Sequence, residues 1–137
     1  MHRVILLLGT NLGDKKKNLI EAKKLIKRQI GIIDENSEQV ESEAIGFVSQ
    51  HTFINEAIVV YTKLSPLKIL KKIKEIERNM GRINESINNI YTDRIIDIDV
   101  IYYNKIIFKS NKLQIPHYKN IHERLFFNTL LKKLYNY

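Results

Sequence analysis

The sequence predicts an α+β fold in which two helices pack on one face of an antiparallel sheet. Segments typical of strands and helices follow one another in the order strand, helix, strand, strand, helix, strand. This βαββαβ order is that of the ferredoxin-like sandwich. The chain has 137 residues, a length that favours one domain. Because no linker or internal repeat interrupts the order, we expect a single domain over residues 1–137.

The first half of the chain predicts a strand, a helix and an extended stretch. Residues 4–8 (VILLL) form a short apolar run typical of a buried central strand. The turn at 9–14 ends in Asp14, which is suited to cap a helix. Apolar residues then recur at helical spacing as far as about Arg28, and Gly31 is expected to stop this helix. Extended segments at 32–33 and 40–45 lead to a loop at 46–52.

The second half predicts a strand at 53–62, where apolar and β-branched residues are frequent. Ser65 followed by Pro66 predicts a helix start, and Gly81 is suited to end that helix. Its expected apolar face consists of Leu67, Leu70, Ile73, Ile76 and Met80. A polar loop at 83–92, a strand at 95–103, a turn at 104–105 and a short return strand at 106–108 follow. A loop at 116–124 and a helix at 125–137 complete the expected order.

The composition excludes some classes of function and leaves others open. The chain has no cysteine, which excludes disulfides, thiolate metal sites and a cysteine nucleophile. The net charge of +8 favours an anionic partner, but the excess of Lys, Ile and Asn makes compositional bias an equally good explanation. No signal peptide and no apolar stretch of roughly 18 residues is evident. We therefore expect a cytoplasmic protein without a membrane span, and the net charge alone does not establish a nucleic-acid partner.

The most specific chemical feature is the segment 94–99 (RIIDID). Asp97 and Asp99 lie two residues apart on a predicted strand, so both carboxylates project from one face. Adjacent carboxylates repel one another unless a cation lies between them, and such oxygen ligands suit Mg²⁺. The alternative is a solvated strand face that carries two acids.

Other residues suggest binding of phosphates and a flat ring. Arginine is scarce beside lysine, and its planar fork suits phosphate; Arg82, Arg94 and Arg124 are therefore candidates, although each alone is more often a surface residue. Metal ions with arginine clamps are typical of phosphoryl-type transfer. The glycine-rich motifs of common nucleotide sites are missing. Asn55, inside an apolar strand, could pair with a heterocycle or with the backbone. Candidates for stacking are Phe53, Tyr91, Phe126 and Phe127.

These motifs occur in the order found in one enzyme family. Residues 9–14 (GTNLGD) resemble its GSNLGD, and 53–55 (FIN) resemble its (Y/F)-(L/I)-N. The SP at 65–66, the IE at 76–77 and the GR at 81–82 resemble its second helix. Residues 94–99 resemble R-T-(I/L)-D-(I/L)-D, and 116–117 (PH) and 122–126 (HERLF) resemble its PH and HERxF. Over nearly its whole length the chain resembles the 6-hydroxymethyl-7,8-dihydropterin pyrophosphokinases of bacterial folate synthesis.

The resemblance implies a ferredoxin-like fold and transfer of the β,γ-diphosphate of ATP to the pterin hydroxymethyl oxygen, with release of AMP. It implies that Asp97 and Asp99 bind two Mg²⁺ ions and that Arg82 and Arg94 are catalytic clamps on the phosphates. The implied ATP-binding residues are Leu70, Lys74, Glu77, Arg94, Ile98, Lys112, His117, Tyr118 and Arg124. The implied pterin-binding residues are Ser42, Ala44, Ile45, Phe53, Asn55, Tyr91, Asp97 and Phe126. Loops at about 46–51 and 83–93 would close over the substrates.

The chain departs from the family pattern at several positions. Glu43-Ala44 replaces a proline-containing segment, Asn84 stands where an arginine is common, and Tyr91 replaces a tryptophan. The loop around Tyr91 is longer by about two residues, Arg124 follows one extra residue, and the segment 128–137 is shorter than the usual tail. These departures leave open a related protein that has lost activity. A second alternative is an RNA-binding sandwich, which would carry aromatic side chains on its middle strands.

Overall fold

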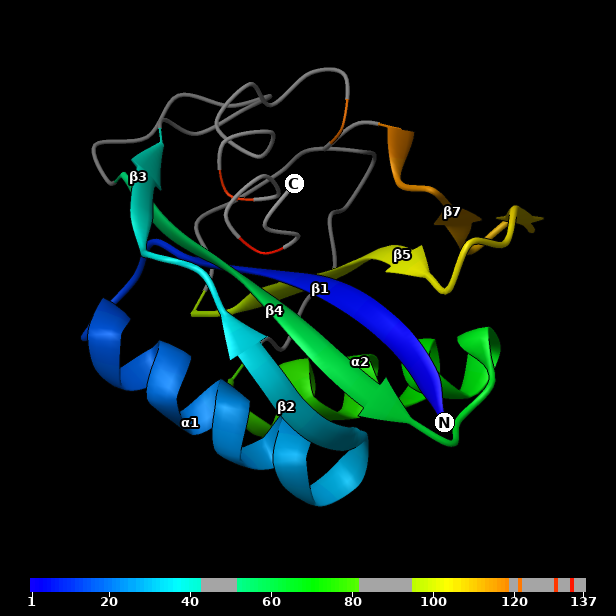
Figure 1. The fold of residues 1–137 in the computed structure, drawn as a ribbon. Coiled ribbons are helices and arrows are strands. Elements are labelled where there is room, and N and C mark those ends of the chain that lie inside the picture. The colour runs from blue at the N-terminus through cyan, green and yellow to red at the C-terminus, as the bar shows by residue number, and fades with distance from the viewer. Residues whose placement is uncertain (43–51, 82–94, 119–120, 122–129, 131–133, 135–137) are drawn as a thin grey trace.

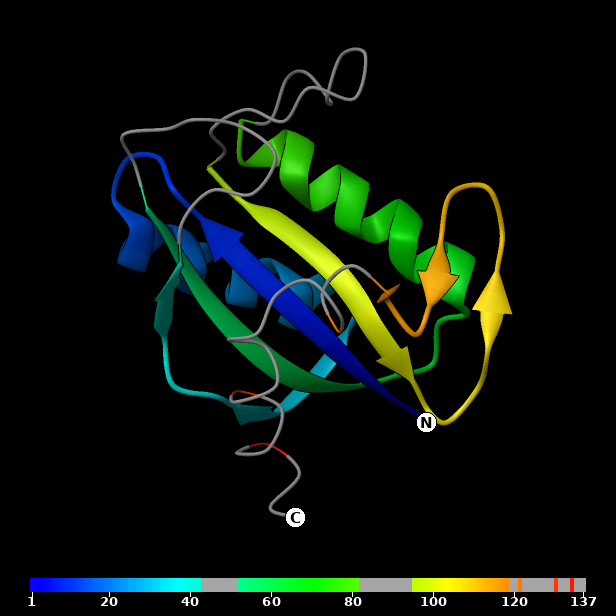
Figure 2. The same cartoon turned by 90° about the horizontal axis from the view of Figure 1, so that it is seen from above.

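The computed structural model describes residues 1–42, 52–81, 95–118, 121, 130 and 134. Its main sheet is antiparallel and has the order β2-β4-β1-β5. The strands are β1 (His2–Thr10), β2 (Gly31–Asn36), β4 (Phe53–Thr62) and β5 (Asp97–Tyr103). Figure 2 shows β1 between β4 and β5, in the middle of the sheet. The ferredoxin-like order and the central first strand are therefore as predicted.

The second strand of the βαββαβ pattern is divided in two. β2 pairs with β4 as far as Asn36, and the short strand β3 (Val40–Ser42) resumes the pairing with β4 opposite Asn55. Ser37 joins the two pieces, because its N–H donates to the carbonyl of Ala57 (2.8 Å) and its hydroxyl accepts from the N–H of Ala57 (2.9 Å). The second extended segment predicted at 40–45 thus ends at Ser42 within the described residues.

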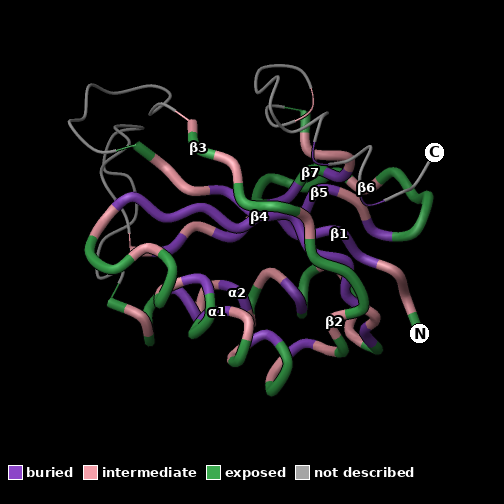
Figure 3. Tube along the Cα trace, turned by 60° about the vertical axis from the view of Figure 1, so that its left-hand side comes forward, coloured by how far each residue is buried: buried purple, intermediate pink, exposed green. Residues whose placement is uncertain are grey.

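Helices α1 (Lys15–Gln29) and α2 (Pro66–Asn79) pack on the same face of the sheet (Figures 1 and 3). The predicted caps are present: the Asp14 carboxylate accepts from the N–H of Lys17 (3.1 Å), and the Ser65 hydroxyl accepts from the N–H of Lys68 (3.4 Å). Gly81 follows α2 with φ of +101°, a conformation that glycine adopts without strain. The helices and sheet bury a core that includes Val4, Leu6, Leu8, Leu19, Ala22, Ile26, Ile58, Val60, Ile69, Ile73, Ile76, Ile98 and Val100.

The buried face of α2 differs from the prediction. Leu67 was expected in the core but is 50% exposed, whereas Ile69, Ile73 and Ile76 are buried. At about 100° per residue, Leu67 lies about 200° around the helix from Ile69 and faces away from the sheet. The half-buried Leu70 packs against the core, as predicted, and both leucines line a surface groove described below.

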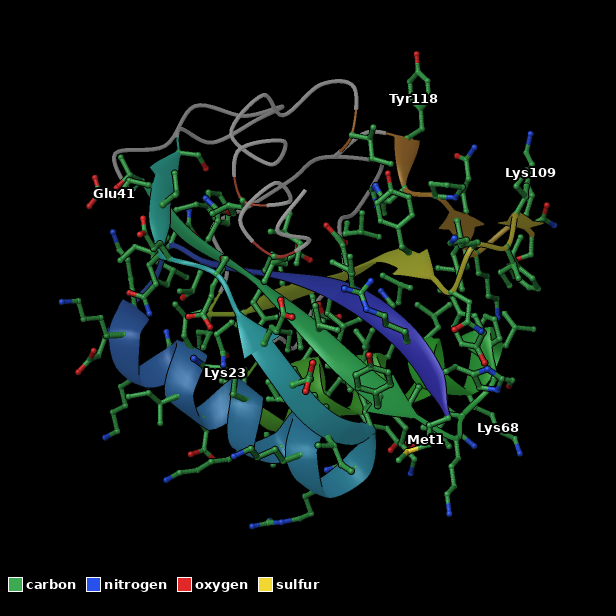
Figure 4. The ribbon with its side chains drawn as sticks, viewed as in Figure 1. Met1, Lys23, Glu41, Lys68, Lys109 and Tyr118 are labelled. Carbon is green, nitrogen blue, oxygen red and sulfur yellow. The ribbon has the colours of Figure 1, made fainter. Side chains whose placement is uncertain are left out.

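A buried ion pair ties α1 to the sheet. Nζ of Lys23 lies 2.7 Å from Oε2 of Glu56, a β4 residue that is 2% exposed. Nε2 of Gln39 donates to the other carboxylate oxygen (3.1 Å). Figure 4 shows Lys23 on α1 beside β2. Both oxygens of a buried carboxylate therefore have partners, as burial of a charge requires.

The opposite face of the sheet carries a second apolar cluster. It consists of Ile5, Leu7, Ala57, Val59, Ile101, Leu130 and Leu134. Leu130 and Leu134 are helical, in agreement with the helix predicted at 125–137, most of which lies outside the described residues. Ile5 and Leu7 of β1, and Ala57 and Val59 of β4, alternate with residues of the first cluster, so each central strand contributes to both clusters.

A β-bulge interrupts the pairing of β5 with β1. Leu6 lies opposite Val100 and Ile5 opposite Tyr102, so Ile101 is the extra residue. Asp97 and Asp99 precede the bulge and lie opposite Gly9 and Leu7. Tyr103 follows it, is buried in the core under the helices, and donates its hydroxyl to the carbonyl of Leu64 (2.9 Å).

The end of the chain departs from the prediction in three ways. The strand predicted at 95–103 begins at Asp97, and the return strand predicted at 106–108 is β6 (Phe108–Lys109). β6 pairs with an unpredicted strand, β7 (Gln114–Ile115), rather than with β5. Tyr118 and Ile121 are helical although a loop was predicted at 116–124, and the N–H of Ile121 donates to the carbonyl of His117 (3.2 Å). Within the described ranges, neither helix is long and apolar enough to cross a membrane.

Candidate active site

Three neighbouring strands bring a polar amide and a carboxylate into one row. Gly9 of β1 lies opposite Asn55 of β4 on one side and opposite Asp97 of β5 on the other. Since neighbouring strands lie about 4.8 Å apart, the backbones of Asn55 and Asp97 are roughly 10 Å apart. Gly9 has no side chain to fill the space between them. Gly9 is itself buried, so the row is a strip of backbone covered by neighbouring side chains, with an amide at one end and a carboxylate at the other.

The two predicted acids project from the face opposite the helices. Asp97 and Asp99 are half-buried, whereas Ile98 between them is 4% exposed and belongs to the core. Oδ1 of Asp99 lies 3.9 Å from Nε2 of His117. The prediction that the two carboxylates share one side of a strand is therefore correct, and the structure adds a histidine beside them.

The position of His117 depends on the bulge in β5. Its N–H donates to the carbonyl of Ile101, the extra residue of that bulge (3.1 Å). The histidine directly follows the cis peptide bond between Ile115 and Pro116. The backbone of β5 thus fixes both the carboxylates and the histidine.

The chemistry of this pair suits a hard divalent cation. Mg²⁺ is typically held by one or two carboxylates together with substrate phosphates and water. Asp97 and Asp99 supply two such groups, and side-chain exposure of 24% at Asp99 leaves room for a ligand. Across the part of the chain that the structure describes, no group of three or more His, Cys, Asp or Glu side chains could enclose a metal. The residues present therefore fit an ion that completes its shell with substrate and water.

Asn55 is held by the neighbouring strand β3. Its Nδ2 donates to the carbonyl of Val40 (3.1 Å) and to the hydroxyl of Ser42 (2.8 Å). A Cβ atom placed on Gly9 would lie 3.2 Å from Oδ1 of Asn55 and 3.5 Å from Cδ1 of Phe53. Asn55 and Phe53, both predicted for the pterin, thus border the strip over Gly9, and Ser42 contacts Asn55.

A basic groove of about 640 Å³ runs along α2. It brings together three residues predicted for ATP, namely Leu70, Lys74 and Lys112. Leu67, Lys71 and Arg78 also line it and were not predicted. Their spacing of four and seven residues along α2 would have identified them as one helix face. Four cations around two leucines suit a ligand with an apolar part and negative charge.

Glu77 and Ile98, also predicted for ATP, are bonded to each other. Oε2 of Glu77, which is 3% exposed, accepts from the N–H of Ile98 (3.0 Å). Its Oε1 lies 3.9 Å from Nζ of Lys74. Since β5 is the edge of the main sheet, this carboxylate takes an N–H that no neighbouring strand accepts. The contact ties α2 to the strand that carries the two acids.

Hydrogen bonds from α1 close the glycine-containing turn that follows β1. Asn18 of α1 donates through Nδ2 to the hydroxyl of Thr10 (3.1 Å) and to the carbonyl of Leu12 (2.8 Å). These bonds close the turn between β1 and α1. The sequence alone did not identify Asn18, because these bonds reach back six and eight residues, beyond the usual local patterns.

Other predicted site residues are not placed beside the acids or are not described. Tyr118 is 56% exposed and points away from the sheet (Figure 4). The following predicted residues lie outside the described part of the chain: Arg82, Arg94, Arg124, Ala44, Ile45, Tyr91, Phe126 and Phe127. The segments 46–51 and 83–93, predicted to be lids, also lie outside it, so these roles stay predictions.

Comparison with known proteins identifies one family. The family model described as 7,8-dihydro-6-hydroxymethylpterin-pyrophosphokinase (HPPK) matches residues 5–136. The chain is 37% identical over 117 residues to the 2-amino-4-hydroxy-6-hydroxymethyldihydropteridine pyrophosphokinase of Porphyromonas gingivalis, covering 83% of this chain and 78% of that protein. It is 42% identical over 114 residues to the folic acid synthesis protein FOL1 of Dictyostelium discoideum. That match covers 83% of this chain but only 17% of the relative.

A solved structure shows the same fold. The Plasmodium falciparum HPPK-DHPS structure with pteroate superposes with a TM-score of 0.71 and 19% identity. The match covers 96% of this chain and 38% of that chain. This likeness supports the ferredoxin-like arrangement of the sheet and helices described above.

Proposed function

Because the chain belongs to the 7,8-dihydro-6-hydroxymethylpterin-pyrophosphokinase family, we propose that it transfers diphosphate from ATP to 6-hydroxymethyl-7,8-dihydropterin. The pterin oxygen forms a bond to the β-phosphorus of ATP, and the bond from that phosphorus to the α-phosphate oxygen breaks. AMP leaves with the electron pair, and the alcohol proton is released to water. The products are the pterin diphosphate and AMP, in folate biosynthesis.

The observation that carries this proposal is the row Asn55, Gly9 and Asp97 across three strands. A bicyclic pterin is roughly as long as the separation of about 10 Å between the ends of this row. With its amino-oxo edge at Asn55, the ring would lie over Gly9 beside Phe53. Its hydroxymethyl group would then lie at the carboxylate end, where Asp97 and Asp99 project.

The carboxylates and His117 would act on the reacting groups at that end. A primary alcohol is a weak nucleophile; Mg²⁺ held by Asp97 and Asp99 would lower the pKa of a coordinated alcohol and offset the triphosphate charge. His117, 3.9 Å from Asp99, would contact a phosphate bound to the ion that these carboxylates hold. The family resemblance adds Arg82, Arg94 and Arg124 as cationic contacts. Such a site works mainly by positioning and charge stabilisation, so no protein nucleophile is required.

We propose the basic groove along α2 as the ATP site. Leu70 provides an apolar contact for the base, and Lys74 and Lys112 provide positive charge. Helix α2 also carries Glu77, which bonds the strand of the acids at Ile98. The groove and the carboxylates therefore belong to adjoining elements, as transfer between two bound substrates requires.

Further parts of the proposal concern the whole protein. We propose two Mg²⁺ ions per site, in line with the resemblance, and a single domain over 1–137 that acts as a monomer in the cytoplasm. We propose ATP and the pterin as its small-molecule partners, without nucleic acid. Asp97 and Asp99 on the polar side of β5 favour this choice, because without a metal they would repel a nucleic-acid backbone.

The decisive experiment is AMP formation by the purified protein with ATP, Mg²⁺ and 6-hydroxymethyl-7,8-dihydropterin. The wild type should form AMP, whereas the double variant Asp97→Ala/Asp99→Ala should not. Asp34→Ala, which removes an exposed acid of β2, is the matched control and should keep activity. ATP binding by the wild type without AMP formation would overturn the proposed reaction and indicate a relative that has lost activity.

A further inference from the structure

Asn55 is a buried amide whose donors are all used by the protein. The residue is 2% exposed. Its Nδ2 lies 3.1 Å from the carbonyl oxygen of Val40 and 2.8 Å from the hydroxyl oxygen of Ser42. An amide nitrogen carries two protons, so these two acceptors account for both of them.

The two partners also decide which way the amide faces. The oxygen and nitrogen of an asparagine are told apart by their hydrogen-bond partners. A backbone carbonyl can only accept, so the atom facing Val40 must be the nitrogen. Oδ1 then faces away from β3, toward Gly9, where a Cβ atom would lie only 3.2 Å from it.

Oδ1 is therefore an acceptor held at the strip over Gly9. Among the described residues, none donates a hydrogen bond to this oxygen. A buried acceptor left without a donor costs about 1–3 kcal/mol. A ligand that lies over Gly9 and presents an N–H group would supply the donor, whereas one that presents a carbonyl there would repel Oδ1.

We propose that Ser42 is a positioning residue that determines specificity through Asn55. Val40 sets the direction of the amide, and the Ser42 hydroxyl holds its second proton and prevents rotation of the group. The site then offers an acceptor alone, and selects a heterocycle with an N–H donor at that edge. This inference rests on the proposed function. It predicts that the protein binds a 2-amino-4-oxo pteridine more tightly than its 2-oxo analogue, in which a carbonyl replaces the amino group.

Ligand binding by Ser42 variants tests the proposal. Dissociation constants for 6-hydroxymethylpterin and 6-hydroxymethyllumazine, its 2-oxo analogue, are measured in the presence of Mg²⁺ and a non-hydrolysable ATP analogue. Ser42→Ala should weaken pterin binding by about fivefold, the equivalent of one hydrogen bond of about 1 kcal/mol, and should reduce the preference for the amino compound. Ser42→Thr keeps a hydroxyl and should restore both.

Ser37→Ala is the matched control, since Ser37 also bonds an edge piece to β4 but at Ala57. It should lower stability without changing the preference between the two ligands. Equal changes in Ser42→Ala and Ser37→Ala would overturn the proposal, because they would reduce Ser42 to a structural contact. Unchanged affinity and preference in Ser42→Ala would also overturn it.

A measurement without ligand separates this inference from the proposed function. In the NMR spectrum of the free wild-type protein, the Nδ2 protons of Asn55 should be protected from exchange with water, and Ser42→Ala should reduce that protection. Rapid exchange in the wild type would overturn the inference even if the enzyme is active. If the wild type binds neither ligand and forms no AMP, the proposed function fails, and the specificity inferred from it is overturned too.

Discussion

His117 and Asp99 lie side by side because both are attached to the same short stretch of β5. Nε2 of the histidine is 3.9 Å from Oδ1 of the aspartate. The N–H of the histidine donates to the carbonyl of Ile101, two residues beyond Asp99 (3.1 Å). The imidazole of His117, which belongs to a different segment of the chain, is thereby held beside the carboxylate of Asp99. This hydrogen bond holds the segment after β7 against β5, the strand that carries the acids.

Replacing either acid by its amide should disable the proposed reaction. Asp97→Asn and Asp99→Asn keep shape but remove the charge available for Mg²⁺, so the rate of AMP formation should fall by roughly 100-fold or more. The Mg²⁺ concentration for half-maximal rate should rise. The control is Asp34→Asn, at an exposed position of β2. A rate within twofold of the wild type in both acid variants would contradict the metal assignment.

Adding one methyl group at Gly9 should weaken pterin binding. The new Cβ of Gly9→Ala would lie 3.2 Å from Oδ1 of Asn55 and 3.5 Å from the Phe53 ring, and it would occupy the strip proposed for the pterin. We expect the dissociation constant for the pterin to rise about tenfold and that for ATP to change little. Isothermal titration with each ligand separately measures both, and equal losses for both ligands would point to a general structural defect.

Removing a cation from the groove along α2 should weaken ATP binding. Lys112→Met removes one of the groove's charges while keeping an apolar stem. A charge-assisted contact of about 1.5 kcal/mol predicts a rise in the dissociation constant of about tenfold. Lys109→Met is the control, because Lys109 is exposed and points into solvent (Figure 4). The loss should shrink at high salt; equal effects of both variants would argue against a specific contact.

The contact between Glu77 and Ile98 should contribute to stability. Glu77→Ala leaves the N–H of Ile98 without its buried acceptor, which should lower the free energy of unfolding by about 1–3 kcal/mol. Urea denaturation measures this change. Glu75→Ala, which removes a partly exposed partner 3.5 Å from Lys72, should cost less than about 1 kcal/mol. A smaller loss in Glu77→Ala than in Glu75→Ala would show that the buried contact adds nothing.

The ion pair of Lys23 with Glu56 should also be stabilising, and a double variant can isolate it. Lys23→Met leaves a buried carboxylate with Gln39 alone. Because Lys23 is 24% exposed, we expect a loss of about 2 kcal/mol, below the value for a fully buried pair. Adding Glu56→Gln should return part of this loss in urea denaturation. If the two single losses simply add in the double variant, the residues do not interact.

The sequence predicted most of the main sheet and both helices because local signals and burial agree there. The strand at 53–62 has the predicted bounds, and α2 begins after the Ser65 cap. The apolar face of α2 was assigned incorrectly at Leu67, because helical spacing from Leu67 and from Ile69 selects different faces. Only packing against the sheet decides between them.

The strand pairings near the chain end could not be read from local pattern. β6 pairs with β7 rather than with β5, and two-residue strands have too few positions to show alternation. The division between β2 and β3 was suggested by two separate extended segments, but their common pairing with β4 depends on Ser37, whose hydroxyl bonds the backbone of Ala57.

For the candidate site, the sequence identified the acids more readily than the residues that hold them. The spacing of Asp97 and Asp99 sufficed to place both on one face. That Asn55 lies opposite Gly9 of β1, or that Ser42 holds Asn55, depends on register between strands distant in sequence. The roles of Arg82, Arg94 and Arg124 rest on resemblance alone.

The extra residue in β5 reverses the odd–even parity of that strand. Asp97, Asp99 and Tyr103 are all odd-numbered, and in a regular strand they would share one side. After Ile101 the parity inverts, so Tyr103 lies under the helices while the acids stay on the opposite side. One strand therefore anchors itself in the core through an aromatic residue and presents charge at its other end. Deleting Ile101 would restore regular alternation and keep the tyrosine and the acids on their present sides, but it would remove the carbonyl that accepts from the N–H of His117.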